Sequence, residues 1–253
     1  MKKIELSNYN VRRKNKIDVV IIHAARQRCA KELIGLLEKR ELSAHYVVDE
    51  MGEVYNLVDE KYRAWHAGAG TWNGESEINS NSIGIELCNG LFGEEPYDKR
   101  QMSALKELCL DLKKRYNIEP YNFIGHSDMA PFRKIDPGTM FEWEEFAKAG
   151  IGLWYEMKKE VDILPCDCMD LLKEIGYGDE NPEATKWAFL RHYNPKLYNF
   201  LGGKKGANEG SIKGVELSDN PLFLRTLCSV RDSFREYKSE KNKQILVKKV
   251  FER

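Results

Sequence analysis

The stretch Ile17-Asp18-Val19-Val20-Ile21-Ile22-His23 indicates the fold class of this chain. Its four consecutive β-branched residues, 19–22, suit a pleated interior position and predict a buried strand that ends at a histidine. The following segment, 29–40, has apolar residues at helical spacing with lysine and glutamate between them, so an amphipathic helix should come next. A buried strand followed by such a helix is typical of an α/β layer structure.

Strands and helices continue to alternate through the first 150 residues. Strand character appears in four further segments: 44–50, 53–58, 82–87 and 122–125. The first two flank Met51-Gly52 and predict an antiparallel hairpin, while apolar spacing over 102–116 predicts a second helix. The segment 61–81 is rich in Gly, Trp, Asn and Ser without a period, and we expect a long functional loop. We therefore predict an α/β fold, a mixed β-sheet flanked by helices, with site residues at strand ends.

The character of the chain changes after Gly152. Short helices separated by Gly, Pro and Asn are expected at 166–175, 182–192 and 221–237. The last of them should start at Asp219-Asn220-Pro221, where a capping side chain precedes a proline in the first turn. A boundary between 150 and 165 is therefore expected. It divides the chain into a domain at 1–155 and a small all-helical domain at 165–253.

The composition excludes several classes of function. Forty Lys and Arg residues balance forty Asp and Glu residues, so the chain lacks the positive field with which nucleic-acid-binding proteins collect phosphate. We expect no nucleic-acid partner. No apolar run approaches the roughly 20 residues that cross a bilayer, so no transmembrane segment is expected. The sequence does not indicate an oligomeric state.

Cysteines and the first residues bear on the location in the cell. Six cysteines are scattered over a chain too long to need disulfides, and we expect reduced thiols. The pair Cys166-x-Cys168 has no second pair at metal-binding spacing. Residues 1–8 contain two lysines but lack the apolar segment of a signal peptide. These features favour a cytoplasmic location.

Histidines supply the first candidates for a catalytic site. His23 and His126 directly follow apolar strands, and Asp136 follows His126 within the segment 126–138. Two imidazoles and one carboxylate would leave one position of a tetrahedral zinc for water, as a hydrolytic metal requires. Single histidines are more often surface or core residues, so at this point a structural role stays open. For His192 we expect the structural role.

Five separated motifs make the chain resemble a known family. In chain order they are Ile21-Ile22-His23, Ser43-Ala44-His45-Tyr46, Ala64-Trp65-His66-Ala67-Gly68, Asn81-Ser82-Ile83-Gly84-Ile85-Glu86 and the segment 126–138. With them the chain resembles the zinc amidases of the AmpD and AmiD type, the Amidase-2 family. Later stretches at 150–154 and 188–195 resemble the AmiD branch, in which a helical peptidoglycan-binding-like domain follows the amidase domain. The resemblance covers about residues 18–200.

The resemblance implies an activity and a role for each motif residue. It implies cleavage between N-acetylmuramic acid, or its 1,6-anhydro form, and L-alanine, in peptidoglycan or muropeptides, for cell-wall turnover and recycling. His23, His126 and Asp136 would hold Zn²⁺, and Glu86 would take a proton from the water that zinc activates. Lys134 would stabilise the oxyanion of the tetrahedral intermediate. The fold that it implies is the mixed sheet flanked by helices.

Further residues are candidates for substrate contacts: His45, Tyr46, Trp65 and His66. The two histidines are equally compatible with hydrogen bonds that orient a metal ligand, or with a structural role. Because His45 and Tyr46 alternate along a strand, only one of them can face the site. Trp65 and Trp72 offer aromatic surface to sugar or peptide, although core packing is the more frequent role of a tryptophan.

One departure from the family and two alternative functions bear on the amidase hypothesis. Family members often have a small polar pair after the first metal histidine, whereas Ala24-Ala25-Arg26 follows here, which would alter substrate contacts. A non-catalytic peptidoglycan-recognition module is the main alternative, but such modules usually lack a zinc ligand. A zinc hydrolase of ordinary peptides would not explain the motifs at 65–68 and 84–86. AmiD-like members act in the envelope, so periplasm or cell envelope is the alternative location if a leader was removed.

Overall fold

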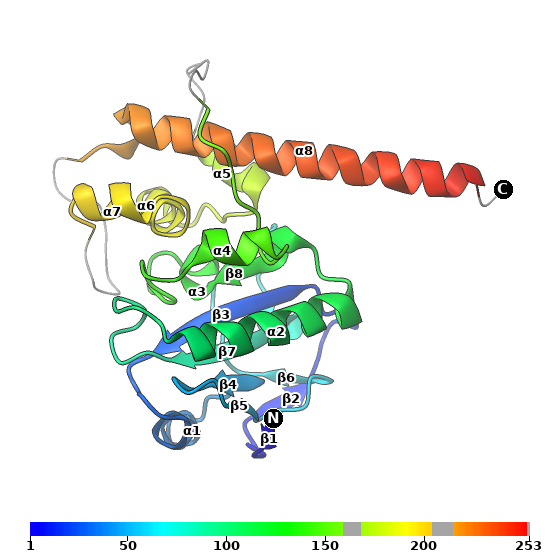
Figure 1. The fold of residues 1–253 in the computed structure, drawn as a ribbon, viewed down its shortest axis with the longest axis vertical. Helices are drawn as coiled ribbons and strands as arrows, with labels where there is room; N and C mark the ends of the chain where they lie inside the picture. Colours follow the sequence, from blue (N-terminus) through cyan, green and yellow to red (C-terminus); the bar gives the residue numbers. More distant parts are fainter. Residues whose placement is uncertain (159–167, 204–214, 252–253) are drawn as a thin grey trace.

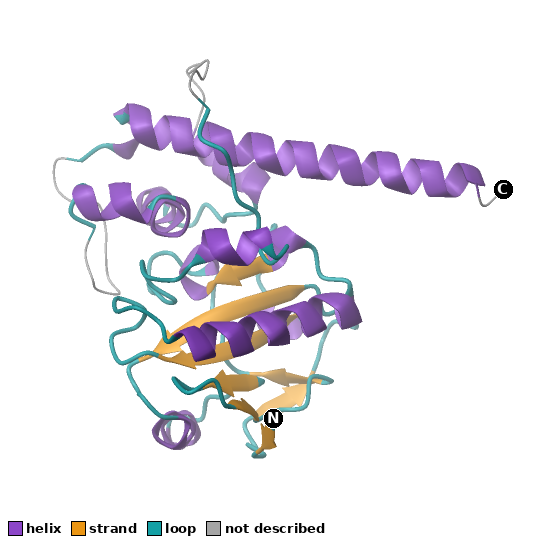
Figure 2. Cartoon of the chain, viewed as in Figure 1, coloured by secondary structure: helices purple, strands orange, loops and turns teal. Residues whose placement is uncertain are grey.

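The computed structural model describes residues 1–158, 168–203 and 215–251. A six-stranded mixed sheet in the order β1-β5-β4-β7-β3-β8 forms its centre (Figure 1). The strands are β1 (Lys2–Lys3), β3 (Val19–Ala25), β4 (Tyr46–Val48), β5 (Val54–Asn56), β7 (Ser82–Cys88) and β8 (Phe123–Gly125). Helices lie on both sides of this sheet, as Figure 2 shows, so the predicted fold class is confirmed.

The two long central strands, β3 and β7, place two candidate site residues side by side. β3 and β7 pair in parallel, and their register places His23 beside Glu86. β8 and β4 add in parallel on either side, while β4 and β5 form the predicted antiparallel hairpin. The hairpin turn contains Gly52 at φ 82°, where an added Cβ would lie 2.7 Å from the Arg100 carbonyl oxygen. Parallel pairing therefore aligns the carboxyl ends of four strands, β4, β7, β3 and β8, at one edge.

Two helices cover opposite faces of the sheet. α2 (Lys99–Tyr116) packs its buried side chains on the inward face of β3, β4 and β7. It begins three residues before the predicted helix because the Asp98 carboxylate caps its first turn by accepting from the Arg100 N–H. α1 (Ala30–Lys39) covers the other face of the sheet, with the apolar residues that its spacing predicted. The core thus forms layers above and below the strands.

The segment 61–81 contains more regular structure than predicted. β6 (Tyr62–Ala64) pairs with β2 (Tyr9–Val11) in a separate two-stranded sheet, and η1 (Ile78–Ser80) adds one 3₁₀ turn. Trp72 is buried, and its Nε1 donates to Asn122 Oδ1 at 3.2 Å. The core role of Trp72 is therefore confirmed. These anchors hold the intervening residues 65–67 firmly over the sheet.

Helices follow in the second half of the chain. After α3 (His126–Met129) and α4 (Trp143–Lys148) come α5 (Cys168–Ile175), α6 (Pro182–Tyr193), α7 (Pro195–Phe200), η3 (Leu217–Asp219) and α8 (Pro221–Phe251). A further 3₁₀ turn, η2 (Pro120–Asn122), precedes β8. α8 is longer than the predicted 221–237 and projects beyond the rest of the molecule in Figure 1. Its start is capped as predicted, since Asn220 Oδ1 accepts from the N–H groups of Leu222 and Phe223.

The helices from α5 onward share one hydrophobic core with the sheet. A continuous cluster of buried side chains joins Val19, Ile21 and Ile124 of the sheet to Trp187 and Leu227 of the helices. The predicted boundary at 150–165 overlaps residues 159–167, which lie outside the described residues, as does Cys166. The division into 1–155 and 165–253 therefore stays a prediction. Among the described helices, none is both long and apolar enough to cross a membrane.

Candidate functional site

Three predicted ligand residues meet at the carboxyl end of the sheet. His23 lies on β3, His126 is the first residue of α3 directly after β8, and Asp136 lies in the following turn. The two Nδ1 atoms are 2.8 Å apart, and Asp136 Oδ2 lies 3.0 Å from the His126 Nδ1 and 3.4 Å from the His23 Nδ1. All three side chains are buried, and their ligand atoms can converge on one metal ion. Two imidazoles and one carboxylate suit zinc.

The outer nitrogen of each imidazole is held by a hydrogen bond, which decides where its proton lies. His126 Nε2 donates to the Ala67 carbonyl oxygen at 2.9 Å. In a neutral imidazole only one nitrogen carries hydrogen, so a neutral His126 has the Nδ1 lone pair available to a metal ion held between His23, His126 and Asp136. This is the arrangement with which proteins orient a metal-binding histidine.

Hydrogen bonds that run from Ser82 through His66 to His23 place the proton of His23 on its outer nitrogen, Nε2, in the same way. Ser82 Oγ donates to the Ile78 carbonyl oxygen at 2.6 Å, so it accepts from His66 Nε2 at 3.3 Å. The remaining nitrogen of His66, Nδ1, is then an acceptor, and His23 Nε2 donates to it at 3.1 Å. In neutral His23, Nδ1 is then the nitrogen that can bind a metal ion. The predicted orienting role of His66 is thus supported by the geometry.

Gly84 makes room for this chain of hydrogen bonds. An added Cβ at Gly84 would lie 2.3 Å from the Cγ of His66 and 2.4 Å from its Nδ1. The imidazole therefore lies directly on the backbone of β7, in a space that any side chain would fill. This contact gives a physical reason for glycine two residues before Glu86.

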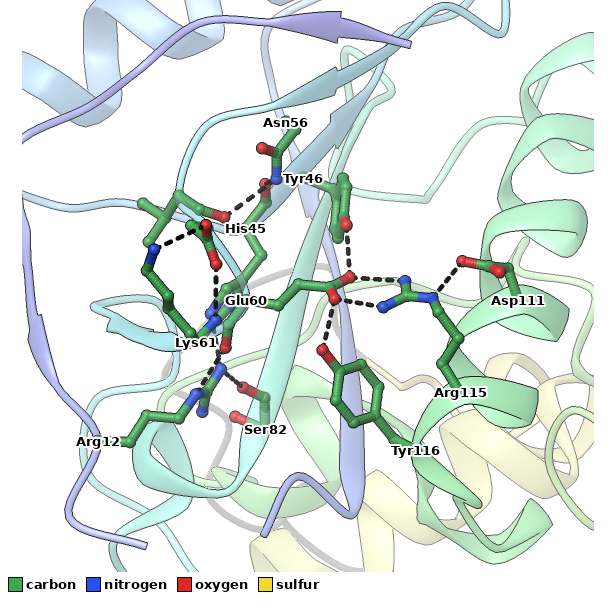
Figure 3. Close-up of polar contacts among 12 residues, drawn as sticks. Arg12, His45, Tyr46, Asn56, Glu60, Lys61, Ser82, Asp111, Arg115 and Tyr116 are labelled. Carbon is green, nitrogen blue, oxygen red and sulfur yellow. Dashed lines mark hydrogen bonds and ion pairs between the residues drawn. The ribbon is translucent and has the colours of Figure 1, made fainter. Parts of the chain in front are cut away.

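His45 supports the scaffold and does not reach the cavity. It is fully buried, its Nδ1 accepts from the Gly84 N–H at 3.0 Å, and its Nε2 donates to the Tyr62 carbonyl oxygen at 3.1 Å. Burial and the charge of Arg12 lower its pKa to about 3, so the ring is neutral. Arg12, shown beside it in Figure 3, donates to the carbonyl oxygens of Glu60 and Ser82. His45 therefore does not line the cavity, and its expected substrate contact has no support in this geometry.

Tyr46 points to the opposite face of the sheet. Its ring packs in the core beneath α2, and its hydroxyl donates to Glu60, which also accepts from Arg115 and Tyr116 (Figure 3). Side chains alternate along β4, so a residue next to His45 must leave the face that carries the ligands. For this reason Tyr46 does not line the cavity, and its expected substrate contact has no support in this geometry.

The other candidate residues border a single cavity of about 200 Å³ beside the three ligands. Its lining includes Trp65, His66, Glu86, Lys134 and Arg26, together with His126 and Asp136. Trp65 is half-buried, with its Nε1 3.4 Å from Asn10 Oδ1, so part of its ring remains open to a ligand. Arg26, from the segment that departs from the family, lies 4.8 Å from the centre of the Phe92 ring. Arg26 and Lys134 therefore contribute two cationic side chains to the rim of the cavity.

Burial and neighbouring charges set the protonation of the cavity. Burial, reinforced by the charge of Asp136 and opposed by Lys134, raises the pKa of Glu86 to about 8. Burial and His126 lower the pKa of His23 to about 4, which keeps it neutral. Burial would raise the pKa of Asp136, but the two imidazoles hold it well below its ordinary value. A divalent cation at the three ligands would favour the Glu86 carboxylate and lower its pKa.

The Amidase_2 family model, described as N-acetylmuramoyl-L-alanine amidase, matches residues 13–139, which contain the three candidate ligands and every residue that lines the cavity. The chain belongs to this family. Over 215 residues the amidase is 34% identical to N-acetylmuramoyl-L-alanine amidase AmiD of Escherichia coli (strain K12), covering 73% of the chain and 77% of that relative. It is 38% identical over 106 residues to the 1,6-anhydro-N-acetylmuramyl-L-alanine amidase AmpD of Haemophilus influenzae, covering 42% of the chain and 56% of that relative.

Solved structures extend the similarity to the helices beyond the family match. The E. coli AmiD complex with anhydro-N-acetylmuramic acid-L-Ala-D-gamma-Glu-L-Lys superposes with a TM-score of 0.69 at 29% identity, over 87% of the amidase and 89% of that chain. AmpDh3 from Pseudomonas aeruginosa superposes with a TM-score of 0.71 at 26% identity, over 93% of the amidase and 100% of that chain. The resemblance to AmpD and AmiD is thus confirmed.

Several residues that shape the site of the amidase were missed from sequence. Ser82 and Gly84 belong to one of the recognised motifs, but their roles depend on contacts with His66, which lies in another segment of the chain. The Ala67 carbonyl is a backbone group and has no sequence signal. Arg12 lies near the start of the chain, outside every motif, and the basic run Arg12-Arg13-Lys14 gives no indication that its side chain is half-buried beside His45.

Proposed function

We propose that this amidase hydrolyses the bond between N-acetylmuramic acid, or its 1,6-anhydro form, and L-alanine in peptidoglycan and muropeptides, with zinc as its cofactor. The convergence of His23, His126 and Asp136 beside Glu86 and Lys134 carries the proposal. A recognition module needs no such set of ligands and acid–base groups. The E. coli AmiD complex supports the substrate class, because in it AmiD is bound to an anhydro-muramyl peptide substrate.

The donor set fits zinc. With their outer nitrogens as hydrogen-bond donors, neutral His23 and His126 can offer their Nδ1 atoms to a divalent cation, and the negative charge of Asp136 favours such an ion. Bound there, zinc would polarise the scissile carbonyl and lower the pKa of a coordinated water to about 7. The fixed outer hydrogen bonds keep both imidazoles in the ligating tautomer.

Glu86 and Lys134 supply the proton transfer and the charge stabilisation. In the described part of the chain, no group hydrogen-bonds to the Glu86 carboxylate, so it is available to a water or a leaving amine. A carboxylate whose pKa lies nearer neutrality than an ordinary glutamate can accept a proton from the attacking water and donate it to the departing nitrogen. The ammonium of Lys134, on the same cavity, stabilises the negative oxygen that develops on the carbonyl.

Glu86→Gln tests the catalytic role. This change keeps the side-chain volume but removes the base, so turnover of a muropeptide should fall by about 10²–10⁴-fold while zinc content is retained. Glu145→Gln, at an exposed pair with Lys148, is the matched control and should cleave like wild type. A chelator should abolish activity and added zinc restore it. Unchanged cleavage by Glu86→Gln would refute the role, and binding of muropeptide without any cleavage by wild type would support the recognition module.

The choice of substrate and the compartment need separate assays. Mass spectrometry of the products from whole sacculi and from soluble anhydro-muropeptide distinguishes intact from anhydro muramyl substrates. The rim residue Arg26 offers a partner for the carboxylates of a stem peptide. Peptidoglycan binding by the helices at 165–253 is part of the proposal, and pull-down with sacculi tests it. Cell fractionation distinguishes a cytoplasmic location from the envelope.

A further inference from the structure

A buried carboxylate beside the metal site is held by the C-terminal helices. Asp128, the third residue of α3, has 1% of its surface exposed. Its Oδ2 accepts from the Gly125 N–H at 2.7 Å and from His192 Nδ1 at 2.8 Å, and its Oδ1 accepts from the Tyr177 hydroxyl at 2.8 Å. The carboxylate thus has three donors, two of them from beyond residue 165.

The short helix α3 that carries Asp128 also sets two of the three metal ligands. His126 is its first residue, and the next residue, Ser127, donates its N–H to the Asp136 carbonyl oxygen at 2.9 Å. A shift of this single turn would move the His126 imidazole and pull on the backbone of Asp136. Four residues are too few for a helix to hold its own position, so tertiary contacts must fix it.

The two donors beyond residue 165 are themselves rigidly placed. The His192 ring on α6 is buried and stacks on Trp143, with centroids 4.0 Å apart and an interplanar angle of 13°. Tyr177, after α5, is buried and packs edge-on against Trp72 with centroids 5.2 Å apart. Each donor is therefore fixed by an aromatic residue of the amidase domain before it reaches Asp128.

We propose that Tyr177 and His192 are positioning residues of the metal site, which act through Asp128 to hold α3, and with it His126 and Asp136, in the ligating arrangement. The inference rests on the proposed metal role of those ligands. Movement of α3 would break the hydrogen bonds from Tyr177 and His192 to Asp128. Because a buried carboxylate without its donors is costly in free energy, these hydrogen bonds hold α3 in place. The C-terminal helices are thus part of the catalytic unit, whatever they bind.

Zinc affinity of the full chain, measured by competition with a metal-binding dye, tests the proposal. Tyr177→Phe removes one hydroxyl and should raise the zinc Kd about tenfold, the lower end of the range for groups that support metal ligands. Tyr237→Phe is the matched control. The Tyr237 hydroxyl on α8 also donates to a carboxylate near the sheet, that of Glu119 at 2.9 Å, but neither residue contacts Asp128. It should leave the zinc Kd unchanged.

A second pair of variants separates positioning from general stability. His192→Leu removes the donor and should weaken zinc binding, whereas His192→Asn keeps an N–H near the place of Nδ1 and should retain most of it. Wild-type zinc affinity in both Tyr177→Phe and His192→Leu overturns the proposal, as does equal weakening by Tyr237→Phe. Zinc binding is measured without substrate, so a failed amidase assay with intact zinc binding would count against the proposed function alone.

Discussion

Replacement of His66 should weaken zinc binding without touching a ligand. In His66→Leu the buried Nε2–H of His23 loses its acceptor, which the wild type provides at 3.1 Å. A buried donor left without a partner costs about 1–3 kcal/mol. His23 can avoid part of this cost by moving its proton to Nδ1, where it blocks the metal. At 1.4 kcal/mol for each factor of ten, we expect the zinc Kd to rise roughly 5–150-fold.

His66→Asn is the matched control for this prediction. Its Oδ1 can take the place of the ring Nδ1 and accept from His23, so zinc binding should stay within a few-fold of wild type. The assay is zinc competition on protein whose circular dichroism and melting temperature show that it is folded. If His66→Leu is folded and binds zinc as tightly as wild type, the tautomer of His23 is not controlled by His66, and the reasoning is refuted.

Two further predictions concern the scaffold. Gly84→Ala places a Cβ 2.3 Å from the Cγ of His66, so the imidazole must move, and both melting temperature and zinc affinity should fall. Burial would raise the pKa of Glu60, but hydrogen bonds led by Arg115 lower it from 4.5 to about 2. The network therefore stabilises the fold above about pH 4.5, and its contribution is lost between pH 4.5 and 2. Urea unfolding of Glu60→Gln should show a weaker pH dependence in that window; an identical dependence would contradict the assignment.

Local patterns in the sequence predicted most of the secondary structure and the metal ligands. The β-branched run before His23 predicted a buried strand because interior strands must be apolar on both faces. Apolar residues three and four apart predicted α1 and α2, since that spacing places them on one helical face. The ligands could be predicted from the short motifs around His23 and the segment 126–138, in which strand ends project side chains from a rigid scaffold.

Side-chain direction was harder to predict near strand ends. His45 and Tyr46 were both candidates for substrate contacts, although alternation allowed only one to face the site. Neither reaches the cavity, because the arginine from the N-terminal segment and Gly84 enclose His45, while α2 covers Tyr46. These neighbours come from positions up to 70 residues away, and no local pattern indicates them.

The sequence by itself determined most of the elements, because they depend on short-range periodicity. It also predicted the metal ligands, from histidines next to strand ends and from the family motifs, and the catalytic carboxylate, from the family motif that ends at Glu86. Only the tertiary structure decided which tautomer His23 adopts and what holds α3 in place. Both depend on hydrogen bonds between segments far apart in the chain: from Ser82 through His66 to His23, and from Tyr177 and His192 to Asp128. Such bonds form only when folding brings buried donors and acceptors together, since each must find a partner once water is excluded.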